Sequence, residues 1–395
     1  MAGHNKRQYG SPAGFLLTVA IGFAFYVMLP LIPSMGITYF AYKNIIDSIG
    51  SDASKQFLWF MINWTEADFT AGVFSSAMVI VGGAIAWQLA VRGSVKRGFP
   101  ICYGSSHTWP WVLAAQVGAL LTNMYLFGYL FLLGRDGVSW VATFIVLVSV
   151  PSALMLTYGP TVPTLLTAII LPASMAAPIS YWLSKTLLPM LKIPGGICNV
   201  LSMALSGFAV MAVCRVLPWI KKVEPKPIPE SGAKEDVFSP VWAVRRAFAE
   251  FSEPHFYGNE IVGACILGGA VIDWIINKEH GLSGLAGEYL PAILLAQFIA
   301  AGVGIFLYAR KFDNGGWYGT YVPVVSSAPW CVLAFGAELP KVIFIAVLSG
   351  ILGAPVASSL GEKLPEGIHI FVANVMAMAI TTAIVWAVMD MMPWF

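Results

Sequence analysis

Apolar residues occur in runs of about 20 along the whole chain, and short polar stretches separate these runs. A run of this length crosses roughly 30 Å of hydrocarbon when it folds as an α-helix. The sequence therefore predicts an all-α polytopic membrane protein with about eleven transmembrane helices. The expected spans are 14–38, 69–90, 109–133, 139–157, 163–184, 197–217, 259–277, 288–308, 318–336, 341–359 and 368–391.

The composition agrees with a bilayer environment, because 58% of the 395 residues are hydrophobic and only 11% are charged. A soluble domain carries about a quarter charged residues. The first apolar run is too long for the core of a signal peptide and lacks a convincing cleavage site, so a retained anchor is expected. The net charge of +2 gives no support to a nucleic-acid partner.

Lysine and arginine residues are distributed unevenly between the loops expected on the two sides of the membrane. If the N-terminus with Lys6 and Arg7 is cytoplasmic, loops on that side hold about twice as many Lys and Arg residues as the outer loops. This excess predicts a cytoplasmic N-terminus and an outer C-terminus. The expected location is the plasma membrane, with a bacterial inner membrane favoured.

The two halves of the chain resemble each other. Segment 198–220 aligns without a gap with segment 373–395, and further matches keep chain order along both halves. Ordered matches of this kind indicate an internal duplication. Each repeat then contains five spans, within 69–217 and 259–395, after an N-terminal region 1–68 that holds one further span.

Five is an odd number, so the second repeat is expected to enter the membrane from the side opposite to the first. Inverted-topology repeats are characteristic of secondary transporters. One fold present in both orientations takes up two unequal conformations that exchange roles. This exchange opens a central site to alternate sides of the membrane.

A linker, residues 218–258, separates the expected repeats. Its part 221–240 is rich in charge and proline, so it is expected to be mobile and cytoplasmic. Ser239 followed by Pro240 predicts the start of a short helix on the inner membrane surface. Residues 55–64 occupy the same place before the first repeat, on the outer side. A structural role is expected for both segments, with a hinge or gate as the alternative.

Proline residues interrupt several expected spans at related places in the two repeats. The predicted helix breaks are at Pro151, Pro178, Pro323, Pro329 and Pro355. A proline frees a carbonyl within a helix, and paired interrupted spans point to a transport site. The alternative is that the prolines only kink helices for packing. In its layout of inverted five-helix units with paired broken helices, the chain resembles carriers of the bile-acid/sodium symporter-like fold.

Polar side chains occur at matched positions inside expected spans of both repeats. Polar groups are costly in lipid and tend to mark pathways or helix contacts. The alternative to a binding role is that they form interhelical hydrogen bonds worth about 1 kcal/mol each. The predicted substrate-binding residues are the matched pairs Gln116 and Gln297, Asn199 and Asn374, and Ser149 and Ser326, together with the unmatched Asn123, for which the alternative is a bond to a neighbouring helix.

Ionisable residues inside the expected spans are few. Asp273 lies within span 259–277 and is the best candidate for carrying a proton or a sodium ion. No pair of acidic residues is expected deep in the bilayer. This pattern argues against a two-carboxylate cation antiporter and favours a neutral or anionic solute.

No enzymatic motif is present. The chain lacks GxxxxGK(S/T), HExxH and GxSxG, and its five histidines do not fall at metal-ligand spacing, so neither an enzyme nor a cofactor or metal is expected. The expected function is H⁺- or Na⁺-coupled secondary transport of a small polar or anionic organic solute by alternating access. The alternatives are a non-transporting membrane subunit of a larger complex and a membrane-embedded enzyme. Assembly into a homo-oligomer is left open.

Overall fold

The computed structural model describes residues 8–133, 138, 140–191, 194–226, 235–279 and 289–392. Within these residues the protein is all-α and contains no strand. Residues 1–7 of the expected N-terminal tail, with Lys6 and Arg7, and residues 227–234 of the expected linker lie outside the described part of the chain.

Seven helical segments of the described chain are long and apolar enough to cross a membrane. This finding is compatible with a multi-pass membrane protein, as the apolar runs predict. The segments are α1 (Pro12–Met28) with the short turn that follows it, α4 (Val73–Val91), α8 (Val162–Leu191), α9 (Gly195–Cys214), α13 (Leu290–Gly315), α15 (Leu339–Gly361) and α16 (Phe371–Asp390).

The predicted count of eleven spans is not confirmed, because four expected spans form short or interrupted helices. These spans are 109–133, 139–157, 259–277 and 318–336. The shorter helices of the structure are α2 (Tyr42–Ser48), α3 (Ala53–Ile62), α5 (Trp109–Leu121), α6 (Phe144–Leu147), α7 (Val150–Tyr158), α10 (Pro240–Glu250), α11 (Glu260–Ile276) and α14 (Ser327–Phe335).

Two interruptions occur at serine residues with similar backbone geometry. Ser149 (φ −133°, ψ −117°) separates α6 from α7, and Ser326 (φ −145°, ψ −95°) precedes α14. Neither residue has helical dihedrals, so each expected span is divided near its middle. The hydroxyl of Ser149 donates to Ile145 O and that of Ser326 donates to Val322 O, both at 2.6 Å.

Three of the predicted break positions lie next to these interruptions. Pro151 lies in the first turn of α7 and Pro329 in the first turn of α14. A proline costs little there, because N–H groups of the first turn have no intrahelical partner. Pro323 lies in the turns that precede Ser326.

The other two predicted breaks do not end a helix. α8 continues through Pro178, and α15 continues through Pro355. A proline inside a helix leaves the carbonyl four residues earlier without its usual donor. For Pro355 that carbonyl belongs to Ile351, and the hydroxyl of Tyr308 donates to it at 2.6 Å. A neighbouring helix thus supplies the missing hydrogen bond.

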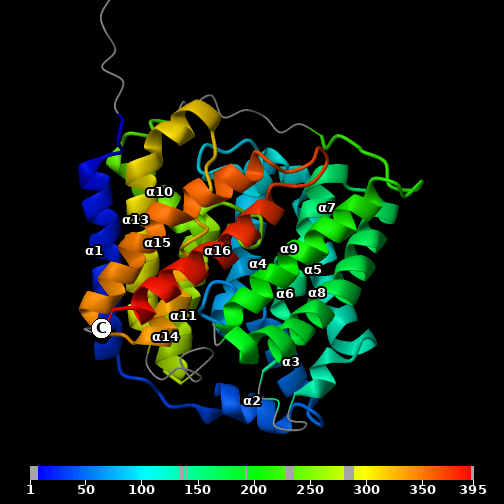
Figure 1. Ribbon diagram of the computed structural model, residues 1–395, viewed down its shortest axis with the longest axis horizontal. Helices are drawn as coiled ribbons and strands as arrows, with labels where there is room; N and C mark the ends of the chain where they lie inside the picture. The colour runs from blue at the N-terminus through cyan, green and yellow to red at the C-terminus, as the bar shows by residue number, and fades with distance from the viewer. Residues whose placement is uncertain are drawn as a thin grey trace, which may run out of the picture.

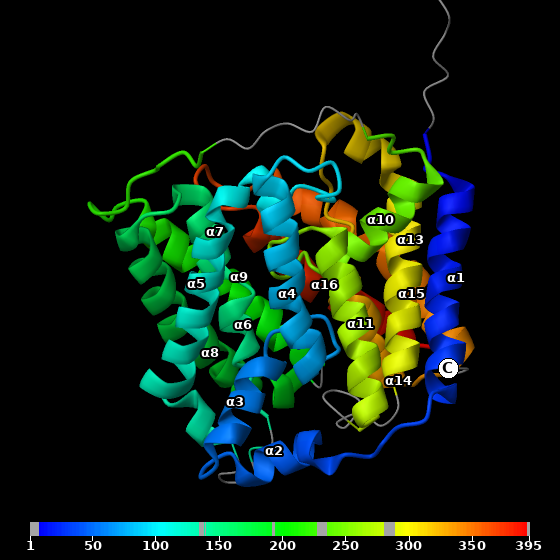
Figure 2. The ribbon, with the colours of Figure 1, turned by 180° about the vertical axis from the view of Figure 1, so that it is seen from behind.

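The helices form two lateral groups joined by a central row (Figures 1 and 2). α1, α13 and α15 lie on one side of the molecule, and α5, α7 and α8 lie on the other. Between the groups, α16 contacts both α15 and α9, and α4 packs along α11. The start of α1 and helix α10 lie toward one end of the molecule, whereas α2 and α3 lie at the opposite end (Figure 1).

Glycines allow α4 and α11 to approach closely. A Cβ atom on Gly82 of α4 would lie 3.0 Å from Val262 Cα of α11. A Cβ atom on Gly269 of α11 would lie 2.5 Å from Ser75 Cα of α4. Small residues at such interfaces let helix backbones pack directly against each other, as they do in membranes.

A candidate binding cavity

Two irregular loops fold into the interior of the protein. The first loop, residues 63–72, joins α3 to α4, and the second loop, residues 251–259, joins α10 to α11. All residues of both loops are buried. Phe69 in the first loop has a φ of +64°, and Phe256 in the second has a φ of +65°. Bulky residues rarely adopt positive φ, so the shared geometry is distinctive.

Hydrogen bonds inside the two loops also correspond. The N–H of Ala71 donates to Thr65 O at 3.0 Å, and the N–H of Gly258 donates to Ser252 O at 3.4 Å. Ala71 and Gly258 both have positive φ. The two loops therefore turn in the same way before each leads into its helix.

Each loop presents a buried glutamate to an indole N–H. Trp140 Nε1 donates to Glu66 Oε1 of the first loop. Trp317 Nε1 donates to Glu253 Oε1 of the second loop at 3.3 Å. The same pair of residue types thus forms the same contact in both halves of the chain.

Two glutamines hold the loops in place, and each contacts the loop of the other half. Gln116 Nε2 donates to the backbone oxygen of His255 at 3.1 Å. Gln297 Nε2 donates to the backbone oxygen of Asp68 at 3.0 Å. The hydroxyl of Tyr257 donates in turn to Gln116 Oε1 at 2.9 Å. These amides satisfy buried carbonyls, and neither glutamine lines the cavity described next.

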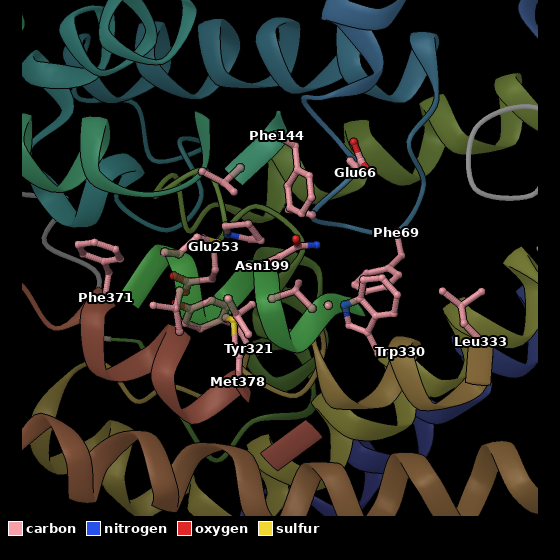
Figure 3. Close-up of a pocket in the computed structure, with 18 of the residues that line it drawn as sticks. Glu66, Phe69, Phe144, Asn199, Glu253, Tyr321, Trp330, Leu333, Phe371 and Met378 are labelled. Carbon is pink, nitrogen blue, oxygen red and sulfur yellow. The ribbon is translucent and has the colours of Figure 1, made fainter. Parts of the chain in front are cut away.

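A cavity of about 350 Å³ lies between the two loops (Figure 3). Most of its wall is apolar and aromatic, and its acidic side chains are Glu66 and Glu253. Much of the wall consists of residue pairs, one from each half of the chain. These pairs are Glu66 and Glu253, Phe69 and Phe256, Phe144 and Tyr321, Val148 and Val325, Val200 and Val375, and Met203 and Met378.

The two glutamates have different surroundings. Glu253 Oε1 lies 2.5 Å from a guanidinium nitrogen of Arg246, and its Oε2 accepts the hydroxyl of Tyr103 at 2.5 Å. Arg246 also lies 3.7 Å from Glu250. Within the described residues no cation pairs with Glu66, and its Oε2 has no hydrogen-bond partner. Within the described residues, an acidic side chain of the cavity wall therefore has a basic partner only on the side of the second loop.

A second cavity of about 510 Å³ lies toward the end of the molecule that carries α10. Tyr103, Arg246 and Trp317 line this second cavity. All three donate hydrogen bonds to Glu253, which lines the first cavity. One layer of side chains around Glu253 therefore separates the two cavities.

Asn199 lines the first cavity, as a binding role requires, and Ser180 donates to its Oδ1 at 2.8 Å. Asn374 lines another cavity and donates to the hydroxyl of Tyr321 at 3.2 Å. Asn123 donates to the backbone oxygen of Ala173 at 3.0 Å. Ser149 and Ser326 bond only to backbone at the helix interruptions described above. The structure thus brings Asn199 to the cavity, whereas Asn374 lines a different cavity, Asn123 bonds to a neighbouring helix, and Ser149 and Ser326 bond to backbone at helix interruptions.

Asp273, the predicted ion-carrying residue, belongs to α11, and its side chain contacts the first turn of α4. Its carboxylate accepts the N–H groups of Phe74 at 2.9 Å and of Ser75 at 2.8 Å. A carboxylate at a helix N-terminus satisfies unpaired N–H groups and interacts favourably with the helix dipole. Asp273 therefore caps a helix of the other half and does not line the cavity.

No acidic pair is expected deep in the bilayer, and that expectation concerns the long apolar spans; the loops between them nevertheless bring several acidic residues into the protein interior. Glu66, Asp68, Glu250 and Glu253 are all buried, and the ring of His255 lies 3.7 Å from Asp68. Hydropathy places the segments that carry them at the membrane surface, because they fall between apolar runs. A sequence signal does exist, since Glu-Ala-Asp-Phe at 66–69 matches Glu-Pro-His-Phe at 253–256.

The helix expected after Ser239 is present as α10, with the Ser239 side chain accepting the N–H of Trp242 at 3.1 Å. It is not a purely superficial helix, because Trp242, Arg246 and Glu250 are buried. α10 positions the second loop as α3 positions the first. Comparisons of the chain with protein family models, with curated proteins and with solved structures find no match.

Proposed function

We propose that the protein is an ion-coupled secondary transporter that moves a small organic solute by alternating access. The observation that carries this proposal is the wall of the cavity, where pairs of corresponding residues from the two halves face one space. A central site at the interface of two repeats is the arrangement that secondary transporters use.

The exchanged glutamine contacts support an inverted duplication. Gln116 of the first half bonds to the second loop, and Gln297 of the second half bonds to the first loop. Reciprocal contacts arise when two units are related by a two-fold axis, because the axis maps each contact onto the other. We propose that the units begin at α3 and α10, so each includes the loop that precedes its first long helix.

The two cavities support alternating access. The layer formed by Tyr103, Arg246 and Trp317 around Glu253 closes the central cavity toward the α10 end. In an inverted repeat, Trp140 and Glu66 form the corresponding barrier on the other side. Exchange of the two barriers between closed and open states opens the cavity to one side at a time.

The cavity also bears on the solute and on the coupling ion. The described wall of the cavity carries two acidic side chains and no basic one that could pair with an anion, so the anionic part of the expected solute range is not retained. Carboxylates bind a proton or Na⁺, and both remain the proposed coupling ions. We propose a bacterial inner membrane location, with the N-terminus and α10 toward the cytoplasm and the C-terminus outside.

Access to the cavity can be tested without knowing the solute. Single cysteines are placed at Val148 and Val325, two wall positions, in a chain whose five native cysteines are replaced. A membrane-impermeant maleimide is applied to proteoliposomes or inverted vesicles, so that each face is exposed in turn. We expect both positions to be labelled from both faces. Val95, which is 84% exposed in a loop, is the control and reacts from one face only.

Labelling of Val148 and Val325 from a single face under all conditions contradicts a carrier. Simultaneous free access from both faces, with ion conduction and no saturation, indicates a channel instead. Solute screening by uptake into proteoliposomes, with and without H⁺ and Na⁺ gradients, then identifies the coupling ion. No gradient-driven uptake of any solute that binds the protein contradicts the proposed transport.

A further inference from the structure

We propose that the central cavity takes an organic ammonium ion with an apolar body, and that Glu66 is the residue that binds its charged group. This inference rests on the proposed function, since it names the solute class of the same cavity. It depends on the difference between two glutamates that otherwise occupy corresponding positions.

Glu253 is already compensated. Arg246 contacts it at 2.5 Å, and Tyr103 and Trp317 donate further hydrogen bonds to its two oxygens. Glu66 has the corresponding indole contact from Trp140, and no cation pairs with it within the described residues. Its Oε2 is buried without a hydrogen-bond partner. A buried carboxylate in this state is stabilised by a cationic ligand that donates hydrogen bonds.

The other charged groups near the cavity do not remove the need for a cation. Asp68 lies two residues after Glu66, and the nearby His255 ring is 3.7 Å from it. Arg246 is shared between Glu253 and Glu250. Carboxylates therefore outnumber cationic side chains around the cavity in the described part of the chain. A cationic ligand can pair with the acidic side chain that has no basic partner, whereas an anionic ligand finds no unpaired basic side chain among the described residues that line the cavity.

The wall of the cavity favours an organic cation over an inorganic one. The aromatic rings of Phe69, Phe144 and Trp330 line the same cavity as the two acidic groups (Figure 3). Aromatic rings attract cations of ligands and also accommodate an apolar body. A hard metal cation requires about six oxygen ligands. In the described residues no group of three or more His, Cys, Asp or Glu side chains is placed to hold a metal.

The volume limits the size of the ligand. About 350 Å³ is near the lower end of the ~300–1,000 Å³ typical of ligand pockets. A single aromatic ring or a comparable aliphatic group fits this space, together with an ammonium group. The Asn199 side chain, which also lines the cavity, offers an amide beside the apolar surface.

Three matched probes test this inference on the full chain in lipid nanodiscs. They are 2-phenylethylammonium, the neutral 2-phenylethanol and the anionic 3-phenylpropanoate. Binding is followed by tryptophan fluorescence, because Trp140 and Trp330 line the cavity, and by isothermal calorimetry. We expect the ammonium probe to bind at least about tenfold more tightly than the alcohol and the carboxylate not to bind, as a charge-assisted contact predicts.

Glu66→Gln keeps the shape of the side chain and an oxygen for the Trp140 indole. This variant is expected to lose the preference for the ammonium probe and to retain weak binding of the alcohol. Glu224→Gln, at an exposed position in the linker, is the matched control and is expected to bind as the wild type does. If Glu66→Gln does not fold, Val148→Phe, which fills the cavity, is expected to weaken binding of the ammonium probe and of the alcohol together.

Equal binding of the ammonium and the alcohol overturns the inference, and so does an unchanged preference in Glu66→Gln. Binding of Na⁺ at Glu66, seen as a Na⁺-dependent and K⁺-independent signal with no amine binding, assigns the residue to the coupling ion and also overturns it. The measurement is separate from transport. Amine binding without two-sided access contradicts the proposed function. Two-sided access without amine binding contradicts only this inference.

Discussion

Gln297 and Asp68 are joined by a hydrogen bond of 3.0 Å between the glutamine amide and the aspartate backbone oxygen, although one lies in α13 and the other in the first loop. Gln116 contacts His255 in the second loop in the same way. Each half of the chain therefore holds the irregular segment of the other half. Such contacts fix the two loops around a common space, and the cavity exists because both loops are held.

Replacing either glutamine by leucine is expected to lower stability. Gln116→Leu and Gln297→Leu each leave a buried loop carbonyl without its donor, which costs about 1–3 kcal/mol. The measurement is the melting temperature in detergent. Gln88→Leu, at an exposed position of α4, is the control and is expected to change it little. Unchanged melting temperatures for both interior variants contradict the role assigned to the glutamines.

The sequence predicts the long helices well, because their apolar runs are long. The expected span 163–184 lies within α8, and Ser239 with Pro240 marks the start of α10 correctly. The glutamines and asparagines at matched positions of the sequence are also buried in the structure. What these residues contact is not predictable, because hydropathy does not distinguish a binding contact from an interhelical hydrogen bond.

Hydropathy does not predict that the central acidic residues are buried. Glu66 and Glu253 lie in short segments between apolar runs, and such segments normally lie at the membrane surface. Their burial depends on two partners distant in the chain, Trp140 and Trp317, and for Glu253 also on Arg246 in the preceding helix. Tertiary packing brings the indoles to these glutamates, so the match between segments 66–69 and 253–256 does not by itself predict a place in a cavity.

A matched pair of glycine variants tests the close contact between α4 and α11. A Cβ atom at Gly269 would lie 2.5 Å from Ser75 Cα, whereas one at Gly268 would meet nothing within 4 Å. Gly269→Ala is therefore expected to force the helices apart and to destabilise the protein by about 1–3 kcal/mol. Gly268→Ala is expected to be neutral or slightly stabilising. Equal melting temperatures for the two variants are incompatible with this packing.

Asp273 provides a test that separates capping from ion transport. Its carboxylate accepts the N–H groups of Phe74 and Ser75. Asp273→Asn retains an oxygen acceptor, so a stability loss of about 1 kcal/mol and an unchanged ion dependence of uptake are expected. Asp273→Ala is expected to cost more stability. Loss of ion coupling in a well-folded Asp273→Asn protein restores the role that the sequence suggests for this residue.

The barrier around Glu253 is expected to control access to the cavity from the α10 end. Tyr103→Phe removes the hydroxyl that donates to Glu253 Oε2 and leaves the ring in place. We expect a cysteine at Val325 to react severalfold faster with maleimide applied from that end. Tyr125→Phe, which loses only an exposed contact with Gln56, is the control. Equal labelling rates in the two variants place the barrier elsewhere.

Arg246 is expected to be the costliest side chain to remove, because it compensates two buried carboxylates. Arg246→Met leaves Glu250 and Glu253 uncompensated, and removing one partner of a buried ion pair costs about 3–5 kcal/mol. The neighbouring Arg245 is partly exposed and pairs with Glu260, so Arg245→Met is the matched control with a smaller loss.

Neutralising one carboxylate decides whether that loss is electrostatic. Glu253→Gln added to Arg246→Met removes one of the two uncompensated charges, so the double variant is expected to melt at a higher temperature than Arg246→Met alone. If the double variant and Arg246→Met have the same melting temperature, the loss of stability comes from the packing of the arginine side chain instead. A recovery by Glu253→Gln that Glu224→Gln does not reproduce shows that charge compensation at the second loop maintains the fold around the cavity.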